Sequence, residues 1–382
     1  MTDPSLTVLQ VLPALETGGV ERGTVDMAEA LVAAGHRALV VSTGGSMVRQ
    51  LTRVGAEHVE LPVRSKNPLA IWRNIGRLAR LIETENVDLV HARSRAPAWS
   101  AMYAARRTKR RFVTTVHGAY GVGNRFKRAY NSVMVRGDRV IAISEFIRDY
   151  VIERYPESKP ARVVVIPRGV DLDLFHPGDV PAARLIQLSE LWSLPDGAPV
   201  ILLPGRLTRL KGQPVLIEAL SLIANRDGVA VFVGGDLGRD AYKAELRQMA
   251  ERFGVADRVW FVGACRDMPA AYSIASVVVS ASTQPEGFGR IAVEAQAMGR
   301  PVIVTDHGGS RETVAPGETG WRVPPGDARA MAAALDEALA MTQPERDALA
   351  GRAVAHVKAN YTKELMCRRT LDLYRDLLAQ RD

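Results

Sequence analysis

Short apolar runs alternate with amphipathic segments along the first half of the chain. Each run rich in Val, Ile and Leu predicts a buried strand, and each amphipathic segment predicts a helix. Strands are predicted at residues 7–12, 38–42, 89–91, 112–116, 139–143 and 163–166. Helices are predicted between them, for example at 21–34, 70–83 and 145–154. This order is typical of a doubly wound parallel sheet.

The alternation stops over residues 171–198 and then resumes. This polar stretch contains Pro177, Gly178, Pro181, Pro195 and Gly197, a composition typical of a junction between domains. Further strands are predicted at 200–203, 230–233, 259–262, 277–281 and 302–305, followed by helices at 328–340 and 344–380. We therefore expect two Rossmann-like α/β domains, residues 1–175 and 176–359, facing a central cleft that binds a ligand at the carboxyl ends of the strands.

The composition restricts the class of protein. The 382 residues are 47% hydrophobic and 24% charged, as in globular proteins with a packed core. No apolar run reaches the ~18 residues needed to span a membrane, and the start of the chain lacks the basic region of a secretory signal. The two cysteines, Cys265 and Cys367, lack the spacing of zinc ligands and are typical of reduced core thiols. We expect a cytoplasmic protein that binds no metal.

Positive charge is concentrated in the first half of the chain. Residues 1–170 contain 26 Lys and Arg against 15 Asp and Glu, a net charge of +11, whereas residues 171–382 carry a net charge of −3. The excess is either a solvated basic surface or a site for an anionic partner. No nucleic-acid-binding motif is present, so we expect no nucleic acid. An anionic membrane surface or an acidic lipid-linked substrate is the better candidate.

The predicted helix at 70–83 carries part of this charge. At 100° per residue, Arg73, Arg77 and Arg80 fall on one side of it. The opposite side is apolar and contains Ile71, Ile75, Leu78 and Ile82. The simplest interpretation is a layer helix with its arginines in water. The alternative is that the arginines, helped by the basic segment 106–111, meet lipid head groups and hold the protein peripherally on the inner membrane.

Two carboxylates flank a glycine-containing turn in the segment from Glu286 to Glu294. This segment, Glu-Gly-Phe-Gly-Arg-Ile-Ala-Val-Glu, follows a predicted strand and opens a helix, so Glu286 belongs to the loop and Glu294 to the helix. Gly287 and Gly289 let backbone N–H groups approach an anion at the helix start. Carboxylates instead accept hydrogen bonds from hydroxyl groups. A ligand that carries both an anion and hydroxyl groups is a sugar nucleotide.

Two cations follow the predicted strand at 200–203. Gly205 ends this strand, and Arg206 and Lys211 come directly after it. Arg offers a planar fork and Lys a point charge, so the two can hold a diphosphate and stabilise the charge that grows on a leaving nucleoside diphosphate. Taken alone, the segment favours a basic surface loop. Its combination with the glutamate segment favours the functional interpretation.

The first domain offers weaker candidates. Gly18 and Gly19 lie in a strand-to-helix turn that can admit a phosphate or a sugar, although the turn lacks the spacing of a dinucleotide fingerprint. His117 follows the predicted strand at 112–116, where it is either structural or a catalytic or sugar-contacting group. Asp171 and Asp173 form an Asp-x-Asp pair, but they lie in the junction and are expected to be structural.

Together these segments resemble the retaining glycosyltransferases of family 4, which have the GT-B fold. The resemblance spans nearly the whole chain. The matching segments are Gly18-Gly19, His117-Gly118, Ala142-Ile-Ser-Glu145, Ile166-Pro-Arg-Gly-Val-Asp171, Gly205-Arg206, Lys211-Gly212 and the pair Glu286 and Glu294. The resemblance implies a metal-independent hexosyltransferase that uses a UDP- or GDP-linked sugar as donor, needs no cofactor, and acts on a glycan or lipid-linked acceptor with retention at the anomeric carbon.

The resemblance also implies roles for individual residues. Arg206 and Lys211 would hold the donor diphosphate, Glu294 the ribose, and Glu286 the donor sugar. The last helix, from about residue 360 to 382, would return to the first, acceptor-side domain. The expected donor-binding residues are Gly18, Gly19, Arg206, Lys211, Cys265 (bordering the nucleobase), Glu286, Gly287, Phe288, Gly289 and Glu294. The expected catalytic residues are His117, Arg206, Lys211 and Glu286.

One position departs from the family pattern. The family usually has Asn where this chain has Arg168, and the added cation would either favour a more anionic acceptor or lie at the surface. Together with the segment from His91 to Ser100, Arg168 is similar to glycosyltransferases of bacterial lipopolysaccharide core assembly. Two other functions remain open at this point. One is a sugar-nucleotide epimerase or hydrolase on the same fold, and the other is a non-catalytic, membrane-associated scaffold.

Overall fold

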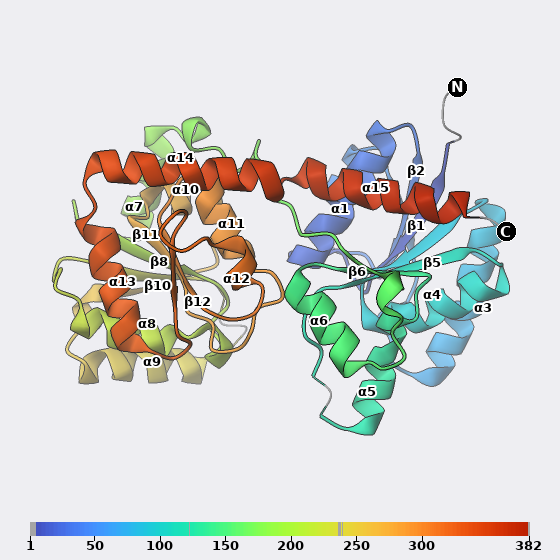
Figure 1. Ribbon diagram of the computed structural model, residues 1–382, viewed down its shortest axis with the longest axis horizontal. Coiled ribbons are helices and arrows are strands. Elements are labelled where there is room, and N and C mark those ends of the chain that lie inside the picture. Colours follow the sequence, from blue (N-terminus) through green and yellow to red (C-terminus); the bar gives the residue numbers. More distant parts are fainter. Residues whose placement is uncertain (1–4, 122, 236–237, 239, 381–382) are drawn as a thin grey trace. The chain divides into compact units, whose positions relative to one another are not determined.

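A computed structural model describes residues 5–121, 123–235, 238 and 240–380. The chain forms two compact units (Figure 1). Unit 1 comprises Met1–Gly169 and Lys363–Asp382, and unit 2 comprises Val170–Thr362. The sequence placed these two boundaries near residues 175 and 359.

Unit 1 is built on a seven-stranded sheet in the order β3-β2-β1-β4-β5-β6-β7, and every strand pair is parallel. Its strands are β1 Thr7–Val11, β2 Arg37–Ser42, β3 Glu57–Glu60, β4 Leu89–Ala92, β5 Arg111–Val116, β6 Arg139–Ala142 and β7 Val163–Val165. Its helices are α1 Gly19–Ala33, α2 Val48–Arg53, α3 Pro68–Thr84, α4 Arg95–Arg107, α5 Arg125–Asn131, α6 Glu145–Arg154 and α15 Lys363–Ala379. The central strands are apolar on both faces because helices cover both sides of the sheet.

Unit 2 repeats the same strand order with six parallel strands, β10-β9-β8-β11-β12-β13. These strands are β8 Val200–Pro204, β9 Val229–Val233, β10 Val259–Gly263, β11 Val277–Ser280, β12 Val302–Thr305 and β13 Trp321–Val323. Its helices are α7 Ala182–Leu191, α8 Gln213–Leu222, α9 Asp240–Arg252, α10 Met268–Ile274, α11 Arg290–Ala297, α12 Ser310–Thr313, α13 Ala328–Ala340 and α14 Gln343–Asn360. Two doubly wound sheets of this kind confirm the predicted fold class.

The direction of winding reverses at one place in each sheet. In unit 1 the reversal lies between β1 and β4, and in unit 2 between β8 and β11. Ligands of doubly wound sheets bind beyond the carboxyl ends of the strands at such a reversal. The candidate residues Gly18 and Gly19 follow β1, whereas Lys211 and Glu286 follow β8 and β11. The topology therefore brings the sequence-predicted segments to the binding edge of each sheet.

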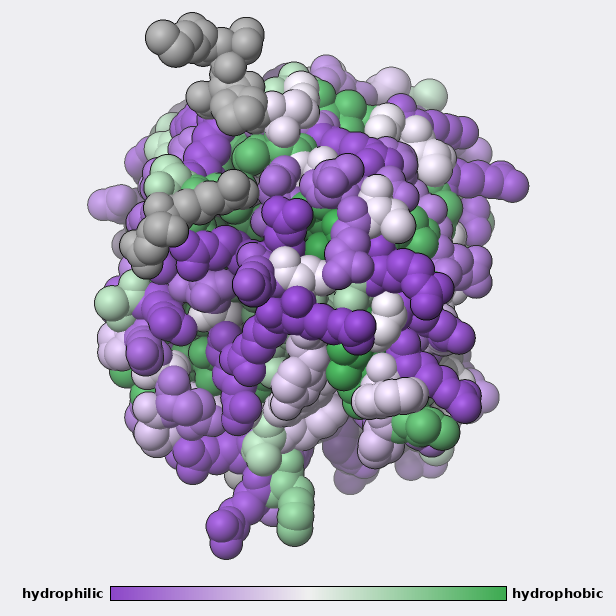
Figure 2. All heavy atoms as spheres, turned by 90° about the vertical axis from the view of Figure 1, so that its right-hand side faces the viewer, coloured by the Kyte–Doolittle hydropathy of each residue, from purple (hydrophilic) through white to green (hydrophobic). Residues whose placement is uncertain are grey.

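Helix α3 has the two faces that its sequence predicts. Arg73, Arg77 and Arg80 are exposed, whereas Leu78 and Ile82 are fully buried. Figure 2 views the side of unit 1 on which α3 lies in Figure 1, and this side is predominantly hydrophilic with scattered apolar side chains. Among the described residues, no helix is both long and apolar enough to cross a membrane.

The last helix, α15, completes unit 1. It packs beside α1, and its side chains Cys367, Leu371 and Tyr374 are buried in the core of that unit. The hydroxyl of Tyr374 lies 2.6 Å from Nδ1 of His91 on β4, and Nε2 of the same ring lies 2.7 Å from the Thr115 hydroxyl on β5. Burial, reinforced by nearby Arg93, holds the pKa of His91 well below its ordinary value. The neutral imidazole thus links α15 to two strands.

Replacing Tyr374 by Phe tests this link. The change leaves Nδ1 of the buried His91 without a partner, so we expect the free energy of unfolding to fall by about 1–3 kcal/mol. Urea unfolding followed by circular dichroism measures the loss. The matched control is Tyr103→Phe, which removes an exposed hydroxyl from α4 and should change stability by less than about 0.5 kcal/mol. Equal stability of the two variants would show that the hydrogen bond does not stabilise α15.

Candidate functional site

A lysine and a glutamate pair at the binding edge of unit 2. The Nζ atom of Lys211, beyond β8, lies 2.5 Å from Oε1 of Glu286, beyond β11. The Ser282 hydroxyl donates a hydrogen bond to the same carboxylate oxygen. Gly212 has a φ of +69°, and a Cβ there would lie 1.8 Å from the carbonyl oxygen of Ala281. Only glycine fits, and this close approach brings the Lys211 loop against the end of β11.

The environment of Glu286 favours its charged form. Its burial acts against the charge, but the Lys211 ammonium and the Ser282 hydroxyl outweigh that effect and hold the pKa of the carboxyl below its ordinary value. Lys211 was predicted to hold a diphosphate, and in the structure its ammonium pairs with the Glu286 carboxylate. An ammonium has three N–H donors, so the pairing with Glu286 leaves donors for a ligand.

The second glutamate of the segment, Glu294, lies on α11. Helix α11 begins after Gly289, which has a φ of +90°, as predicted from the glycines. The Tyr272 hydroxyl donates to Oε2 of Glu294 at 2.8 Å, and Arg290 donates to Oε1 at 2.5 Å. Burial, followed by the Glu294 charge, raises the pKa of Tyr272 well above its ordinary value, so the phenol remains a donor. These contacts orient a mostly buried carboxylate whose oxygens keep free lone pairs.

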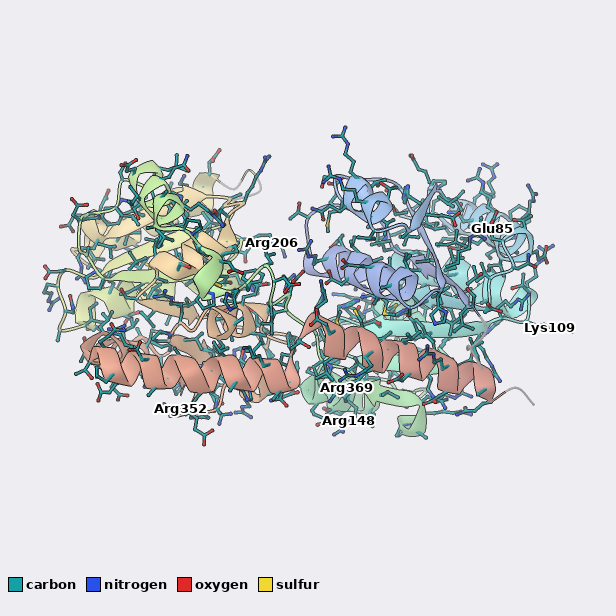
Figure 3. All side chains as sticks on the ribbon, turned by 90° about the horizontal axis from the view of Figure 1, so that it is seen from above. Glu85, Lys109, Arg148, Arg206, Arg352 and Arg369 are labelled. Atoms are coloured by element: carbon teal, nitrogen blue, oxygen red, sulfur yellow. The ribbon has the colours of Figure 1, made fainter. Side chains whose placement is uncertain are left out.

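The remaining predicted residues of unit 2 differ in exposure. Arg206 is exposed, and within the described part of the chain its guanidinium has no hydrogen-bond or ion-pair partner (Figure 3). The Phe288 side chain is buried against Tyr361, with ring centroids 5.5 Å apart, so only its backbone is available to a ligand. Gly287 is half-buried beside Glu286. Cys265 is half-buried in a groove of about 740 Å³ whose lining also includes Leu188, Leu191, Trp192 and Trp260.

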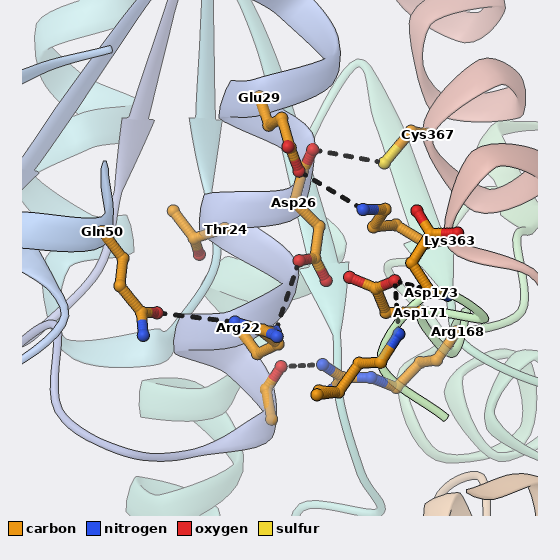
Figure 4. Close-up of polar contacts among 12 residues, drawn as sticks. Arg22, Thr24, Asp26, Glu29, Gln50, Arg168, Asp171, Asp173, Lys363 and Cys367 are labelled. Atoms are coloured by element: carbon orange, nitrogen blue, oxygen red, sulfur yellow. Dashed lines mark hydrogen bonds and ion pairs between the residues drawn. The ribbon is translucent and has the colours of Figure 1, made fainter. Parts of the chain in front are cut away.

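The predicted residues of unit 1 meet around the start of α1. Gly18 caps this helix, Gly19 is its first residue, and His117 follows β5. Arg168, which follows β7, donates one hydrogen bond to the carbonyl oxygen of Gly19 and another to Nδ1 of His117, at 3.2 Å. Figure 4 shows Arg168 beside the N-terminal end of α1. Arg168 is 8% exposed, which rules out the expectation of a surface arginine.

A second buried arginine, Arg93, follows β4 in the same unit. Its Nη1 donates to Oε1 of Gln10 at 3.1 Å, and its Nε has no hydrogen-bond partner in the described part of the chain. A Cβ on Gly23 would lie 3.1 Å from Arg93 and 3.3 Å from Arg168, so the absence of a side chain there leaves room for both guanidinium groups. Both buried arginines therefore lie against one turn of α1.

Several residues of these sites carry no sequence signal. Tyr272 lies on α10, outside every segment singled out in the sequence, and Arg93 lies in the segment from His91 to Ser100 but was given no role of its own; the tertiary structure brings both to the edge of their sheets. Ser282 lies between the predicted strand 277–281 and the segment that begins at Glu286, and was within reach of sequence reasoning. Asp171 accepts hydrogen bonds from the backbone N–H groups of Asp173 and Leu174, which is the structural role expected for the Asp-x-Asp pair. No cluster of metal-ligating side chains occurs among the described residues.

The sequence matches two family models. Residues 17–174 match the model described as glycosyltransferase family 4, and residues 188–354 match glycosyl transferases group 1. A mannosyltransferase of Mycolicibacterium smegmatis, GDP-mannose-dependent alpha-(1-6)-phosphatidylinositol monomannoside mannosyltransferase, is 32% identical over 293 residues, which cover 73% of this chain and 74% of the relative. The chain belongs to glycosyltransferase family 4.

Other similar proteins agree with this assignment. The crystal structure of a glycosyltransferase from Rickettsia africae superposes with a TM-score of 0.91 at 36% identity and covers 99% of this chain and 100% of its own. An Anabaena protein, HepE, solved with UDP and glucose, shares the fold at a TM-score of 0.84 and 23% identity, with 97% of this chain and 100% of that chain covered. The D-inositol 3-phosphate glycosyltransferase 2 of Catenulispora acidiphila is 37% identical over 219 residues, or 54% of this chain. The chain spans about half the length of that relative, 50%.

Replacing Lys211 by Met tests the coupling of Lys211 and Glu286. The side chains of the pair are about one-fifth exposed. Loss of the pair should therefore lower the free energy of unfolding at pH 7 by about 2 kcal/mol relative to the parent, a deficit between those of surface and buried pairs. Without the ammonium, burial raises the pKa of Glu286 above its unfolded value, and the native state then binds more protons than the unfolded state. The deficit relative to the parent should therefore shrink as the pH falls from 7 to 5.

Urea unfolding of the parent and of Lys211→Met at both pH values measures this effect. The control is the double variant Lys211→Met with Glu286→Gln, which has no titrating group at position 286. Its deficit should be the same at pH 5 and pH 7. An equal deficit of the single variant at the two pH values would contradict the assigned coupling.

Proposed function

We propose that this protein is a hexosyltransferase that moves a sugar from a nucleoside diphosphate to a hydroxyl group of an acceptor, with retention at the anomeric carbon. The observation that carries the proposal is the arrangement around Lys211 and Glu286. A cation and a charged carboxylate lie together where the winding of unit 2 reverses, and a second oriented carboxylate, Glu294, lies on the adjoining helix. Membership of glycosyltransferase family 4 supports it.

The chemistry of these groups suggests a division of roles. Arg206 and Lys211 bind the diphosphate, because both are donors with positive charge. Glu294 accepts hydrogen bonds from the ribose hydroxyls, and Glu286 with the backbone N–H groups of 287–289 binds the sugar. Cys265 borders the nucleobase, which is uracil or guanine, and Gly18, Gly19 and His117 contribute from unit 1. The protein needs no further cofactor.

The transfer proceeds by displacement on the same face of the sugar. The bond between the anomeric carbon and the diphosphate oxygen breaks as the acceptor oxygen forms its bond to that carbon, and the acceptor proton passes to the departing phosphate oxygen. Arg206 and Lys211 stabilise the negative charge on that phosphate, so the protein supplies the positive charge that a metal provides elsewhere. Glu286 and Glu294 do not act as the nucleophile and general acid of a retaining glycosidase. Glu286 orients the sugar and Glu294 orients the ribose.

Replacing Arg206 or Lys211 by Ala tests the diphosphate assignment. Each change should lower kcat/KM at least tenfold, or about 1.4 kcal/mol of transition-state stabilisation. The matched control is Arg209→Ala in the same loop, whose exposed guanidinium pairs with Glu245 and should leave kcat/KM within twofold. A thermal-shift panel of UDP-, GDP- and ADP-sugars first identifies the donor. If Arg206→Ala and Lys211→Ala both stay within threefold of the parent, the assignment fails.

The acceptor is proposed to be a glycan or a lipid-linked molecule, including the lipopolysaccharide core. Relatives named after inositol phosphates and phosphatidylinositol mannosides support an anionic or lipid-linked acceptor. The net positive charge of residues 1–170 supports the same class. We further propose that α3 meets an anionic membrane through Arg73, Arg77 and Arg80, with Trp72, which is 69% exposed, at the interface.

Vesicle binding tests the membrane proposal. Changing Arg73, Arg77 and Arg80 together to Gln should weaken co-sedimentation with phosphatidylglycerol vesicles by at least tenfold, because each basic residue near an anionic surface contributes about 1 kcal/mol. A control variant removes the same charge from exposed arginines elsewhere, at Arg252, Arg329 and Arg368. Binding that falls equally in both variants would point to net charge alone, and no binding by the parent would refute the proposal.

A further inference from the structure

Arg168 connects the two candidate segments of unit 1. Its Nη2 donates to the carbonyl oxygen of Gly19, and its Nη1 donates to Nδ1 of His117 at 3.2 Å. Gly19 begins α1 and His117 follows β5, so one planar group bridges two loops that are almost a hundred residues apart in the sequence. An Asn side chain at this position would lack the second donor arm and the reach of a guanidinium.

The bond from Arg168 determines which nitrogen of His117 carries the proton. A guanidinium has only donors and remains charged in proteins. The Nδ1 atom that receives its hydrogen bond must therefore present a lone pair. A neutral His117 then carries its hydrogen on Nε2. This tautomer follows from the identity of the partner, because the reverse arrangement would set two N–H groups against each other.

The surroundings of His117 oppose a charged ring. Burial lowers the pKa of His117 well below its ordinary value, and Arg168, Arg93 and His91 lower it further. The remaining neighbour, Tyr120, accepts a hydrogen bond from the backbone N–H of His117 at 3.4 Å. No ion pair joins His117 to any carboxylate of the described residues, and Glu21 and Asp26 act on Arg93 instead. The ring is thus neutral at physiological pH.

The Nε2–H group of His117 is a hydrogen-bond donor without an acceptor among the described residues. The Nε2 atom itself is buried. His117 lines a cavity of about 20 Å³ together with Gly23, Arg93 and Thr115, and this cavity has room for one water molecule. A buried polar group without a partner is costly and is retained where a ligand or a water completes it. The His117 side chain is therefore prepared to donate a hydrogen bond, and it has no free lone pair with which to accept a proton.

We propose that Arg168 is a positioning residue that holds His117 as a neutral Nε2–H donor and holds the Gly18–Gly19 turn beside it. The proposal rests on the proposed function for the identity of the ligand, which is an oxygen atom of the donor or acceptor. It assigns His117 the role of a neutral hydrogen-bond donor and excludes it as a general base. Arg168 acts through His117 and the turn.

Nuclear magnetic resonance tests the tautomer without any substrate. Long-range proton–nitrogen spectra of the full chain with ¹⁵N-labelled histidine report which ring nitrogen carries hydrogen, and the His117 signals are assigned by their loss in His117→Gln. We expect a neutral ring with hydrogen on Nε2 from pH 8 to pH 5.5. In Arg168→Asn the ring should populate both tautomers, and its protonation midpoint should rise because a neighbouring positive charge is gone. A control variant, Arg162→Asn, should leave the His117 signals unchanged.

Three results would overturn the proposal. They are hydrogen on Nδ1 in the parent, a protonation midpoint of His117 at or above pH 6.5, and an Arg168→Asn variant whose His117 signals match those of the parent. Should Arg168→Asn fail to fold, Arg168→Lys serves instead, because a single ammonium keeps the charge but lacks the fork that reaches both partners. These readouts do not depend on turnover, so their failure is distinct from a failure of the proposed transferase activity.

The pH profile of transfer provides a second measurement. For the parent, kcat/KM should show no loss from His117 between pH 8 and pH 5.5. For Arg168→Asn it should fall at least fivefold at pH 8, and it should fall a further threefold or more towards pH 5.5 as His117 becomes protonated. A loss that is the same at every pH, with an unchanged tautomer, would indicate a merely structural role for Arg168 and would refute the positioning role.

Discussion

Parallel pairing of the strands is the constraint on which the two sites depend. In a parallel sheet every strand leaves the sheet at the same edge, and the backbone hydrogen bonds that fix the register also fix which loops become neighbours. Gly19 follows the first strand of unit 1, His117 the fifth and Arg168 the seventh, yet the three are in contact. In unit 2 the same rule brings Lys211 and Glu286 together across 75 residues of sequence. Neither site could form within a single segment.

The two units satisfy their buried charges in different ways. In unit 2 each glutamate has a cation beside it, Lys211 for Glu286 and Arg290 for Glu294, so the charges are balanced within the protein. In unit 1 the Arg93 guanidinium is met by the neutral amide of Gln10 and forms no ion pair with a described carboxylate. Desolvation of that arginine lowers its pKa without removing its charge. The Arg93 guanidinium therefore stays charged at the edge of unit 1, where Glu21 and Asp26 act on it without a direct ion pair among the described residues.

The sequence correctly predicted those strands and helix starts that are determined by the order of apolar and glycine residues within a short segment. The buried central strands have continuous apolar runs, and Gly289 with Glu294 identified the start of α11. The edge strands β3 and β13 were missed because they are short and half-exposed, and the predicted helix 344–380 is divided at Tyr361 without a proline or glycine to signal the break. Tyr272 was missed, and Arg93 was given no role of its own, for a different reason. Their roles arise from contacts with residues remote in sequence, which no local spacing encodes.

The return of α15 to unit 1 affects how the chain folds while the ribosome synthesises it. Unit 2 is one continuous stretch, whereas residues 1–169 of unit 1 lack the helix that carries Cys367, Leu371 and Tyr374 until residues 363–379 have been synthesised. The buried polar edge of His91 and the apolar surface beneath α15 remain uncovered while the whole of unit 2 is being synthesised. Residues 1–169 therefore emerge before unit 2 but reach their native state only after α15 has followed it, and that interval is when the nascent protein most needs protection from aggregation.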